Sequence, residues 1–380
     1  MKKRWIFAVL IVGAFIFWGQ SAFASVEIYG RASMATYWDH KFSNWYSVGS
    51  SEKDDLRWYM DSSATRLGMN FKAGDITGRW EIDAASDTDI NGNYIGSGGS
   101  GRGGMRLRHA YGEWNFGAGK LLIGQTDPLS DFTVTNVMFT GSNMKAWGEM
   151  GSSVSRVSQI RLTYGNLKLA AITPNTDRRM AGFGASDNWV SAYIPKLEAR
   201  YDYKWKNLSL MGVGGVQVYQ ENNPARTDSK TVSAYILGLG AKYNQGSFYM
   251  NASANWRQNG RNYGMRTEAD EQAYYISAGS NPGVYNAHAW AFAGVIGYKF
   301  HERFTGEVGY TKIFSSSGGQ LKTRDEVQGY YFSGTWEIAK GFKVFPELIV
   351  FDRESRFRNG VETKQGSRMV GGLFWQMDFK

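Results

Sequence analysis

The chain has 380 residues, no cysteine and a formal net charge of +9. This length suffices for one large barrel or two ordinary domains, and the absence of cysteine excludes disulfides as a source of stability. Aromatic residues make up 15% of the chain, although the mean hydropathy is −0.41. Globular cores seldom need so many amphipathic rings, whereas a membrane barrel places Tyr and Trp at both membrane interfaces around a polar lumen. The composition therefore favours an all-β membrane barrel.

Residues 1–24 have the pattern of a secretory signal peptide. A Lys-Lys-Arg start precedes an apolar run that stops at Trp18, and Ala-Phe-Ala before Ser25 offers a small-x-small cleavage site. The alternative, a single transmembrane anchor, needs about 20 apolar residues, and this run is shorter. We therefore expect export through a cleaved signal peptide, with residues 25–380 forming a transmembrane β-barrel in the outer membrane of a Gram-negative bacterium.

Segments that alternate between apolar and polar residues follow one another to the C-terminus, and they predict an antiparallel barrel of about sixteen strands. The expected strands are 26–38, 64–73, 77–86, 105–117, 119–126, 156–164, 166–174, 197–205, 207–219, 231–244, 246–258, 286–300, 304–314, 326–338, 342–354 and 366–379. Short turns alternate with long polar loops near 39–63, 87–104, 127–155, 175–196, 220–230, 259–285, 315–325 and 355–365. An even strand number and this alternation are typical of bacterial outer-membrane barrels.

The two faces of a strand are plainest in 197–205. Leu197, Tyr201 and Trp205 lie on the parity expected to face lipid, and Arg200 and Asp202 lie on the other. An Arg or Lys facing lipid at the midplane would cost about 2–4 kcal/mol, whereas a water-filled lumen solvates it. Pro346 is the exception within a strand, because proline removes a ladder donor, and we expect a bulge or a strand boundary there.

Four short motifs resemble the trimeric Gram-negative porins. They are Val26-Glu-Ile-Tyr-Gly-Arg31, Arg66-Leu-Gly-Met-Asn-Phe-Lys, Arg108-His-Ala-Tyr-Gly-Glu-Trp and Arg156-Val-Ser-Gln-Ile-Arg161. The Arg108-His-Ala-Tyr and Gly124-Gln125-Thr126 stretches are most similar to the DcaP-like branch. The resemblance implies a sixteen-stranded barrel, usually a homotrimer, whose third long loop folds inward to narrow the pore.

The resemblance also implies a pore constriction in which basic residues on the wall face acidic residues on that loop. Carried over to this sequence, the wall residues are Arg31, Arg66, Arg108 and Arg161, and Arg106 joins them because it shares the face of Arg108. The loop at 127–155 offers Asp127, Asp131 and Glu149, but the Pro-Glu-Phe-Gly-Gly motif of many general porins is absent. The other interpretation of these charges is a set of lumen salt bridges with no role in transport.

In the expected strand 105–117, strict alternation would place polar side chains on the face toward lipid. If Arg108 points inward, strict alternation turns His109 and Glu113 outward, where lipid is a poor neighbour for a carboxylate. Two explanations remain open for Glu113, a subunit interface or a position in water at the periplasmic rim.

Rings of arginine favour anions, so the sequence predicts a porin for passive diffusion of small hydrophilic, mostly anionic solutes. Two alternatives stay open, a substrate-selective porin with a weak saturable site and a closed barrel that serves as an adhesin or structural protein. The expected partners are outer-membrane lipids and lipopolysaccharide, small solutes and two further copies of the chain. Nucleic acid is not expected, because the basic residues alternate along strands and do not gather in one patch.

No enzymatic activity and no cofactor or metal are expected. The four histidines are far apart in the sequence, and His288 with Ser277 or Ser280 is the least implausible start of a catalytic site. The segment 87–93, Asp-Thr-Asp-Ile-Asn-Gly-Asn, resembles the first half of an EF-hand loop, but Gly98 stands where the bidentate Glu is needed. We therefore treat divalent-ion binding there as a minor alternative.

Overall fold

The computed structural model covers most of the chain after the expected signal peptide. It describes residues 25–42, 55–62, 64–84, 105–138, 148–150, 156–176, 180–181, 189–222, 228–276, 283–318, 323–358, 361–364 and 366–380. The expected signal peptide at 1–24, the segment 87–93, and Ser277 and Ser280 lie outside the described residues.

All the regular elements in the described part of the chain are β-strands, and no helix there is long and apolar enough to cross a membrane. The strands are β1 (Ser25–Lys41), β2 (Asp55–Asp61), β3 (Arg66–Ala73), β4 (Ile76–Ala84), β5 (Met105–Asn115), β6 (Lys120–Thr126), β7 (Val157–Tyr164), β8 (Leu167–Ile172), β9 (Trp189–Ser191), β10 (Lys196–Trp205), β11 (Leu208–Asn222), β12 (Ser229–Gln245), β13 (Phe248–Gln258), β14 (Tyr274–Ile276), β15 (Gly283–Tyr285), β16 (Ala287–His301), β17 (Phe304–Ser317), β18 (Thr323–Ala339), β19 (Phe342–Arg358), β20 (Val361–Lys364) and β21 (Ser367–Phe379).

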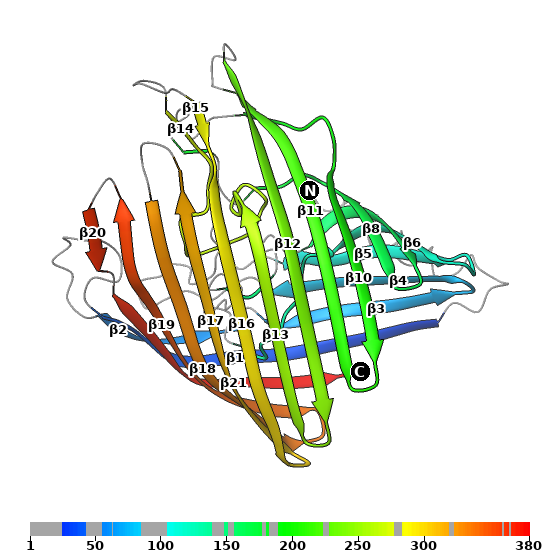
Figure 1. The fold of residues 1–380 in the computed structure, drawn as a ribbon. Helices are drawn as coiled ribbons and strands as arrows, with labels where there is room; N and C mark the ends of the chain where they lie inside the picture. Colours follow the sequence, from blue (N-terminus) through cyan, green and yellow to red (C-terminus); the bar gives the residue numbers. More distant parts are fainter. Residues whose placement is uncertain are drawn as a thin grey trace, which may run out of the picture.

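Sixteen of these strands form a closed antiparallel barrel (Figure 1). Their order around the ring is β1-β3-β4-β5-β6-β7-β8-β10-β11-β12-β13-β16-β17-β18-β19-β21, and β21 pairs with β1. The short strands β2, β9 and β20 extend this wall at one end of the barrel, and β14 pairs with β15 in a separate hairpin. The predicted fold class and strand number are confirmed.

Tight turns occupy the other end of the barrel. Gly74, Gly165, Gly246 and Gly341 adopt φ values of 58°, 54°, 59° and 80° at four of them, a conformation that glycine accepts without strain. The Asp378 N–H donates to the carbonyl oxygen of Gly341 over 2.8 Å, so the C-terminus lies at this end as well. Both the short turns and the position of the terminus agree with the predicted arrangement.

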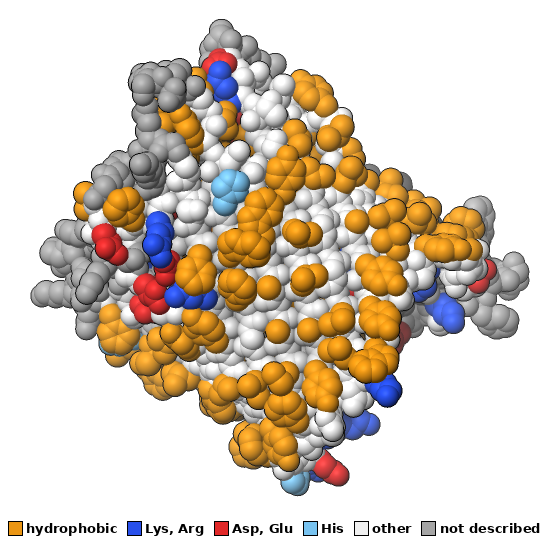
Figure 2. Space-filling view, viewed as in Figure 1, with side chains coloured by type: hydrophobic (Ala, Val, Ile, Leu, Met, Phe, Trp, Pro, Cys, Tyr) orange, Lys and Arg blue, Asp and Glu red, His pale blue; other side chains and the backbone are white. Residues whose placement is uncertain are grey.

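The outer surface of the barrel is largely apolar (Figure 2). Leu197, Tyr201 and Trp205 of β10 are exposed on it, as the alternation predicts. A charged group interrupts this surface toward the outer ends of β17–β19, where the Lys312 Nζ lies 3.2 Å from Glu354 and 3.5 Å from Glu326. Arg324 also binds Glu326, so two cations and two carboxylates neutralise one another, which lowers their cost on this apolar outer surface, the apolar belt of the barrel.

A β-bulge in β5 contradicts the predicted outward direction of His109 and Glu113. His109 pairs with Glu81, but Leu107 pairs with the next residue of β4, Ile82, so Arg108 is an extra residue in the strand. The bulge reverses the alternation, and both Arg108 and His109 are buried. Glu113 consequently points to the inside of the barrel, two residues before the end of β5, where Lys120 binds it at 3.2 Å; a subunit interface is therefore not needed to explain it, and the explanation by a position at the rim stays open.

Pro346 lies within β19, which is neither bulged nor ended there. It pairs with Leu373 of β21 on one side. On the other side it faces Gly334 of β18, where an added Cβ would come within 2.9 Å of the proline ring. Glycine therefore makes the room that the ring needs, and the proline is accommodated inside an otherwise continuous strand.

Two of the long loops fold into the barrel. We name residues 127–156, between β6 and β7, the third loop, and residues 259–286, between β13 and β16, the sixth loop. Apolar side chains of both loops share one buried cluster with the inner faces of the wall strands. The cluster includes Leu129, Phe132, Val134 and Met150 from the third loop, Tyr263, Met265 and Ala269 from the sixth, and Val213, Ile236, Ala289, Ala291, Ile313, Ile349 and Phe351 from the wall. Part of the barrel interior is therefore a hydrophobic core.

Candidate pore constriction

A row of charged side chains crosses the inner face of five neighbouring strands. Asp378 of β21 pairs in register with Arg31 of β1, Arg31 with Arg66 of β3, Arg66 with Asp83 of β4, and Asp83 with Arg106 of β5. The Arg31 Nε donates to Asp378 over 2.9 Å, and the Arg106 Nε donates to Asp83 over 3.0 Å. The ends of the row are thus neutralised, with Arg66 between them.

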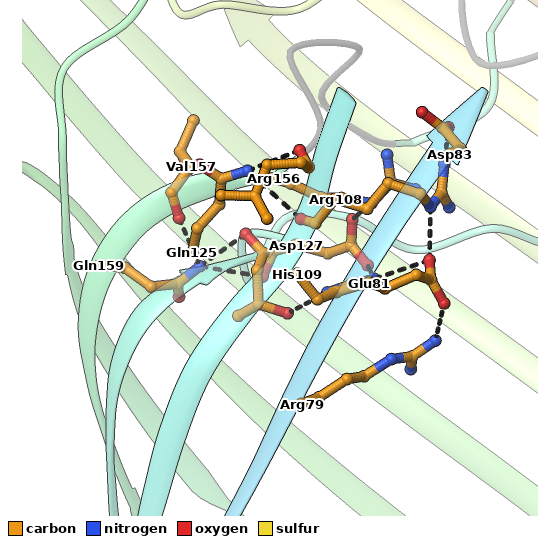
Figure 3. Close-up of polar contacts among 12 residues, drawn as sticks. Arg79, Glu81, Asp83, Arg108, His109, Gln125, Asp127, Arg156, Val157 and Gln159 are labelled. Carbon is orange, nitrogen blue, oxygen red and sulfur yellow. Dashed lines mark hydrogen bonds and ion pairs between the residues drawn. The ribbon is translucent and has the colours of Figure 1, made fainter. Parts of the chain in front are cut away.

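Arg108 extends this row because the bulge turns it toward the acids of β4 (Figure 3). Its guanidinium donates to Glu81 and, over 2.8 Å, to Asp83. Glu81 also accepts hydrogen bonds from Arg79 and from the Tyr29 hydroxyl, the latter at 2.8 Å. The side chains of Arg108 and Glu81 are only 10% and 1% exposed, so this network is largely shielded from water. We refer to Arg108 together with Arg31, Arg66, Arg106 and Arg161 as the arginine wall.

Among the described residues, Arg66 differs from Arg31, Arg106 and Arg108 because no carboxylate binds it; Arg161 also lacks a bound carboxylate, but it donates to Gln159 and to the carbonyl oxygen of Asp127. Within this part of the chain Arg66 makes no ion pair, and its buried Nε has no hydrogen-bond partner. Asp83, its neighbour in register, is already bound by Arg106 and Arg108. Arg66 therefore contributes a positive charge that no carboxylate binds, between Arg31 and an Asp83 that other arginines already bind, and such a charge attracts anions.

The third loop brings Asp127 close to Arg156 and Arg161, and Asp131 close to Arg200. The Asp127 carboxylate lies 3.4 Å from the Arg156 Nε, and its carbonyl oxygen accepts a hydrogen bond from Arg161. The carbonyl of Asp131 accepts from Arg200 over 3.4 Å. Burial and the nearby Arg108 lower the pKa of Arg156, while Asp127 and Asp131 raise it. Asp127 and Asp131 thus partly offset the desolvation of the Arg156 guanidinium.

Glu149 serves a different purpose from the one predicted for it. It is buried, and its carboxylate accepts hydrogen bonds from the N–H groups of Val134 and Thr135 and from the Thr135 hydroxyl, the last two at 2.9 and 3.0 Å. Glu149 therefore joins two parts of the third loop to each other, and the described geometry does not bring it to the arginine wall.

Carboxylates of the opposite wall hold the third loop in place. Glu198 of β10 accepts hydrogen bonds from the Ser130 N–H and hydroxyl, both at 2.9 Å. Glu307 of β17 accepts from the Asn136 N–H at 2.9 Å, and Glu347 of β19 accepts from the Met138 N–H at 2.7 Å. The loop thus follows the inner wall from β10 to β19. Gly148 lies so close to this wall that a Cβ would come within 2.8 Å of the carbonyl oxygens of Phe292 and Lys312.

The predicted site residues therefore form two groups and one outlier. Arg31, Arg66, Arg106 and Arg108 lie in one network, Arg161 with Asp127 and Asp131 lies near it at the start of the third loop, and Glu149 stands apart. The sequence interpretation missed Arg79, Arg156 and Arg200. Arg200 has inward parity in 197–205, so its alternation could have identified it, whereas Arg156 adopts φ of 80° in a loop, where alternation gives no guidance.

Other chemistry finds little support in this geometry. Among the described residues, no group of three or more His, Asp or Glu side chains is arranged to hold a metal ion. His288 lies on the outer face of β16 and stacks on Trp256, with ring centroids 5.9 Å apart. This position in the apolar belt suits a membrane-facing side chain better than a catalytic base.

Comparisons with solved structures identify the architecture. The outer-membrane channel DcaP of Acinetobacter baumannii aligns over 96% of this chain and 99% of its own, with a TM-score of 0.67 and 21% identity. An anion-selective porin from Comamonas acidovorans aligns over 94% and 100%, with a TM-score of 0.55 and 13% identity. The trimer form of OmpT, an outer-membrane protein of Vibrio cholerae, aligns over 94% and 99%, with a TM-score of 0.53 and 12% identity. No family model and no curated protein matches the sequence. The chain therefore has the fold of the outer-membrane channels and porins, with DcaP among the structures that it resembles.

Proposed function

We propose that the protein is an outer-membrane porin through which small hydrophilic anions diffuse passively. The observation that carries this proposal is the arginine wall beside the third loop, with the unpaired charge of Arg66 at its centre. An anion can exchange part of its hydration shell for the guanidinium groups along this wall and leave again, because several groups of similar kind follow one another. The protein acts as a channel and carries out no catalysis.

The proposal also includes the export of the protein, its membrane contacts and its assembly. Residues 1–24 direct export and are removed, the apolar belt contacts outer-membrane lipids and lipopolysaccharide, and three copies assemble into a trimer. The porin fold and the exposed aromatic side chains support these points.

A second candidate is a porin with a weak saturable site for one class of anion. The unpaired Arg66 favours it, because a desolvated cation without a counter-charge binds an anion longer than a neutralised pair does. Saturation of the current as the concentration of one anion rises would distinguish this candidate from simple diffusion.

Planar-bilayer recording from the refolded mature protein across a salt gradient tests the proposal. We expect openings in groups of three and a reversal potential of the sign that anion selectivity requires. Heat-unfolded protein in the same detergent is the control. Folded protein that never conducts would contradict the channel and would direct attention to the outer surface as a binding site.

A further inference from the structure

The sixth loop enters the barrel from a base that is fixed by hydrogen bonds. The Asn259 amide nitrogen donates to the side-chain oxygen of Asn286 over 2.7 Å, and the Asn259 side-chain oxygen accepts from the Ala287 N–H over 2.8 Å. These contacts join the first residue of the loop to its last residue and to the first residue of β16. They lie directly above the Gln258–His288 pair, where β13 and β16 are still in register.

The sixth loop is attached to the inner wall at two places, which we call its first and second seats, and the first seat is on β10 and β11. The Tyr263 hydroxyl donates to Glu198 over 2.8 Å, on the same carboxylate that holds Ser130 of the third loop. Burial and the neighbouring Glu198 raise the pKa of Tyr263 well above its ordinary value, so the hydroxyl remains a donor. Gly215 of β11 leaves the space for this ring, because an added Cβ would come within 1.9 Å of the hydroxyl oxygen.

Further contacts with β11 reinforce this seat. The Gln217 amide donates to the carbonyl oxygen of Asn262 over 2.6 Å, and the Asn262 amide donates to the Tyr219 hydroxyl over 3.0 Å. Together with the hydrogen bond between Tyr263 and Glu198, these contacts fix residues 262 and 263 of the sixth loop on β10 and β11.

The second seat lies across the barrel on β18 and β19. The Asp270 N–H donates to Asp325 over 3.1 Å, and Arg356 donates to the Asp270 carboxylate over 2.7 Å. Arg353 binds Glu268 of the same loop. The sixth loop is therefore anchored at both limits of the wall from β10 to β19, the same part of the wall that the third loop follows.

The space beneath the sixth loop is filled. Arg257 of β13 has no exposed surface and lies 3.2 Å from Glu271, which also accepts a hydrogen bond from the Thr267 hydroxyl at 2.7 Å. Met265 is fully buried, and Ala289 of β16, which pairs with Arg257, is 1% exposed. At this level β13 and β16 thus meet packed side chains of the sixth loop.

We propose that the sixth loop is a second size-limiting element of the channel, which with the third loop closes the side of the lumen bounded by β10–β19 and confines solutes to the arginine wall of β1 and β3–β8. This inference rests on the proposed function. The inner faces of β3–β8 fit it, because Arg66, Arg79 and Arg161 retain partial exposure there, whereas many inner side chains of the opposite wall, polar and apolar, are buried against the two loops.

The first test deletes the sixth loop. Since β13 and β16 stay paired up to Gln258 and His288, residues 260–285 can be replaced by a two-residue Asn-Gly turn that joins the two strands. We expect single-channel conductance to rise at least about twofold, if about half of the cross-section is released, and larger neutral polymers to enter the pore. Unchanged conductance and an unchanged exclusion limit in folded protein would overturn the inference.

A second test uses single cysteines, which the natural chain lacks. Ala289→Cys, beneath the sixth loop, should resist a water-soluble thiol reagent in the full chain and react in the deletion variant. Thr163→Cys, on the inner face of β7, is the matched control and should react in both. A reactive Ala289→Cys in the full chain would refute the filled side of the lumen.

Point variants keep the inference testable if the deletion variant does not fold. Tyr263→Phe removes only the hydroxyl that binds Glu198, and we expect larger fluctuations of the open-channel current. Tyr201→Phe, on the outer face of the same barrel, is the control. Equal current noise in both variants would count against the seat on Glu198. A full-length protein that does not conduct would instead contradict the proposed function itself.

Discussion

At the scale of single residues, the arginines of the lumen differ in how far their charge is compensated. Arg31, Arg106 and Arg108 bind carboxylates, whereas Arg66 has none. A neutralised pair contributes little to the field at a distance, because its two charges cancel and salt screens the remainder over about 8 Å. Selectivity should therefore depend most strongly on the arginine that is unpaired.

Arg66→Gln should lower the permeability of anions relative to cations. A unit charge about 4 Å from a passing anion contributes about 1 kcal/mol in water, which corresponds to roughly a fivefold change in occupancy. The reversal potential across a salt gradient measures this change. Arg57→Gln, an exposed residue paired with Asp55 on β2, removes the same charge far from the wall and serves as the control. Equal shifts for both variants would show that Arg66 has no special role.

Arg108→Met should destabilise the barrel. Glu81 and Asp83 would each lose one charged hydrogen bond, and such bonds contribute about 1.5–3 kcal/mol. Arg79 and Arg106 still bind the two acids, which keeps the loss at the lower end. Urea unfolding followed by the gel mobility of unheated samples gives the stability. Arg106→Met, whose side chain is half exposed and binds only Asp83, should lose less. The reverse order of stabilities would contradict the network.

The residue-scale error in the sequence interpretation has a physical cause. Strict alternation predicts that His109 and Glu113 point outward, but the bulge at Arg108 turns them inward. Residues on one face of a regular strand are an even number of positions apart. Leu107 and Trp114 both point outward but are an odd number of positions apart, so the sequence does carry a sign of the bulge. A change of parity within one strand is a sign of a bulge that a fixed period of two overlooks.

At the scale of elements, small residues on the wall determine how closely the loops approach. Gly238 and Gly240 of β12 lie beneath Met150 and Phe132 of the third loop, and added Cβ atoms would come within 2.1 and 2.3 Å of those side chains. The inner face of β16 carries alanine at 287, 289, 291 and 293. The wall thus provides a flat surface on which the loops pack.

Gly240→Val should push the third loop toward the open side of the lumen and lower the single-channel conductance. The added side chain would overlap the ring of Phe132, and overpacking of this kind typically costs about 1–3 kcal/mol. Valine favours strands, so β12 itself should persist. Gly294→Val on the outer face of β16 meets no atom within 4 Å of its Cβ and should leave the conductance unchanged. Equal conductance of the two variants would contradict the contact.

At the scale of the whole molecule, the sequence predicts the ring and, through the family resemblance, the inward third loop, but it does not predict the inward sixth loop. Alternation, turn glycines and the spacing of loops specify sixteen strands, because each strand shows its two faces locally. The sixth loop was expected as an outer polar loop, and it folds inward. Its inner contacts use single residues such as Tyr263 and Asp270, and their partners on β10 and β18 lie far away in the sequence. No local period marks such contacts, so only the three-dimensional arrangement reveals them.

The barrel wall and the two inward loops are stabilised by different kinds of interaction. The ring is held by a continuous hydrogen-bond ladder without edges, whereas the third and sixth loops are held by buried apolar contacts and a few carboxylates. Mild denaturant weakens the second kind before the first. The width of the lumen consequently depends on how firmly the two loops are held. A partly denatured molecule would keep its barrel wall intact around a wider lumen.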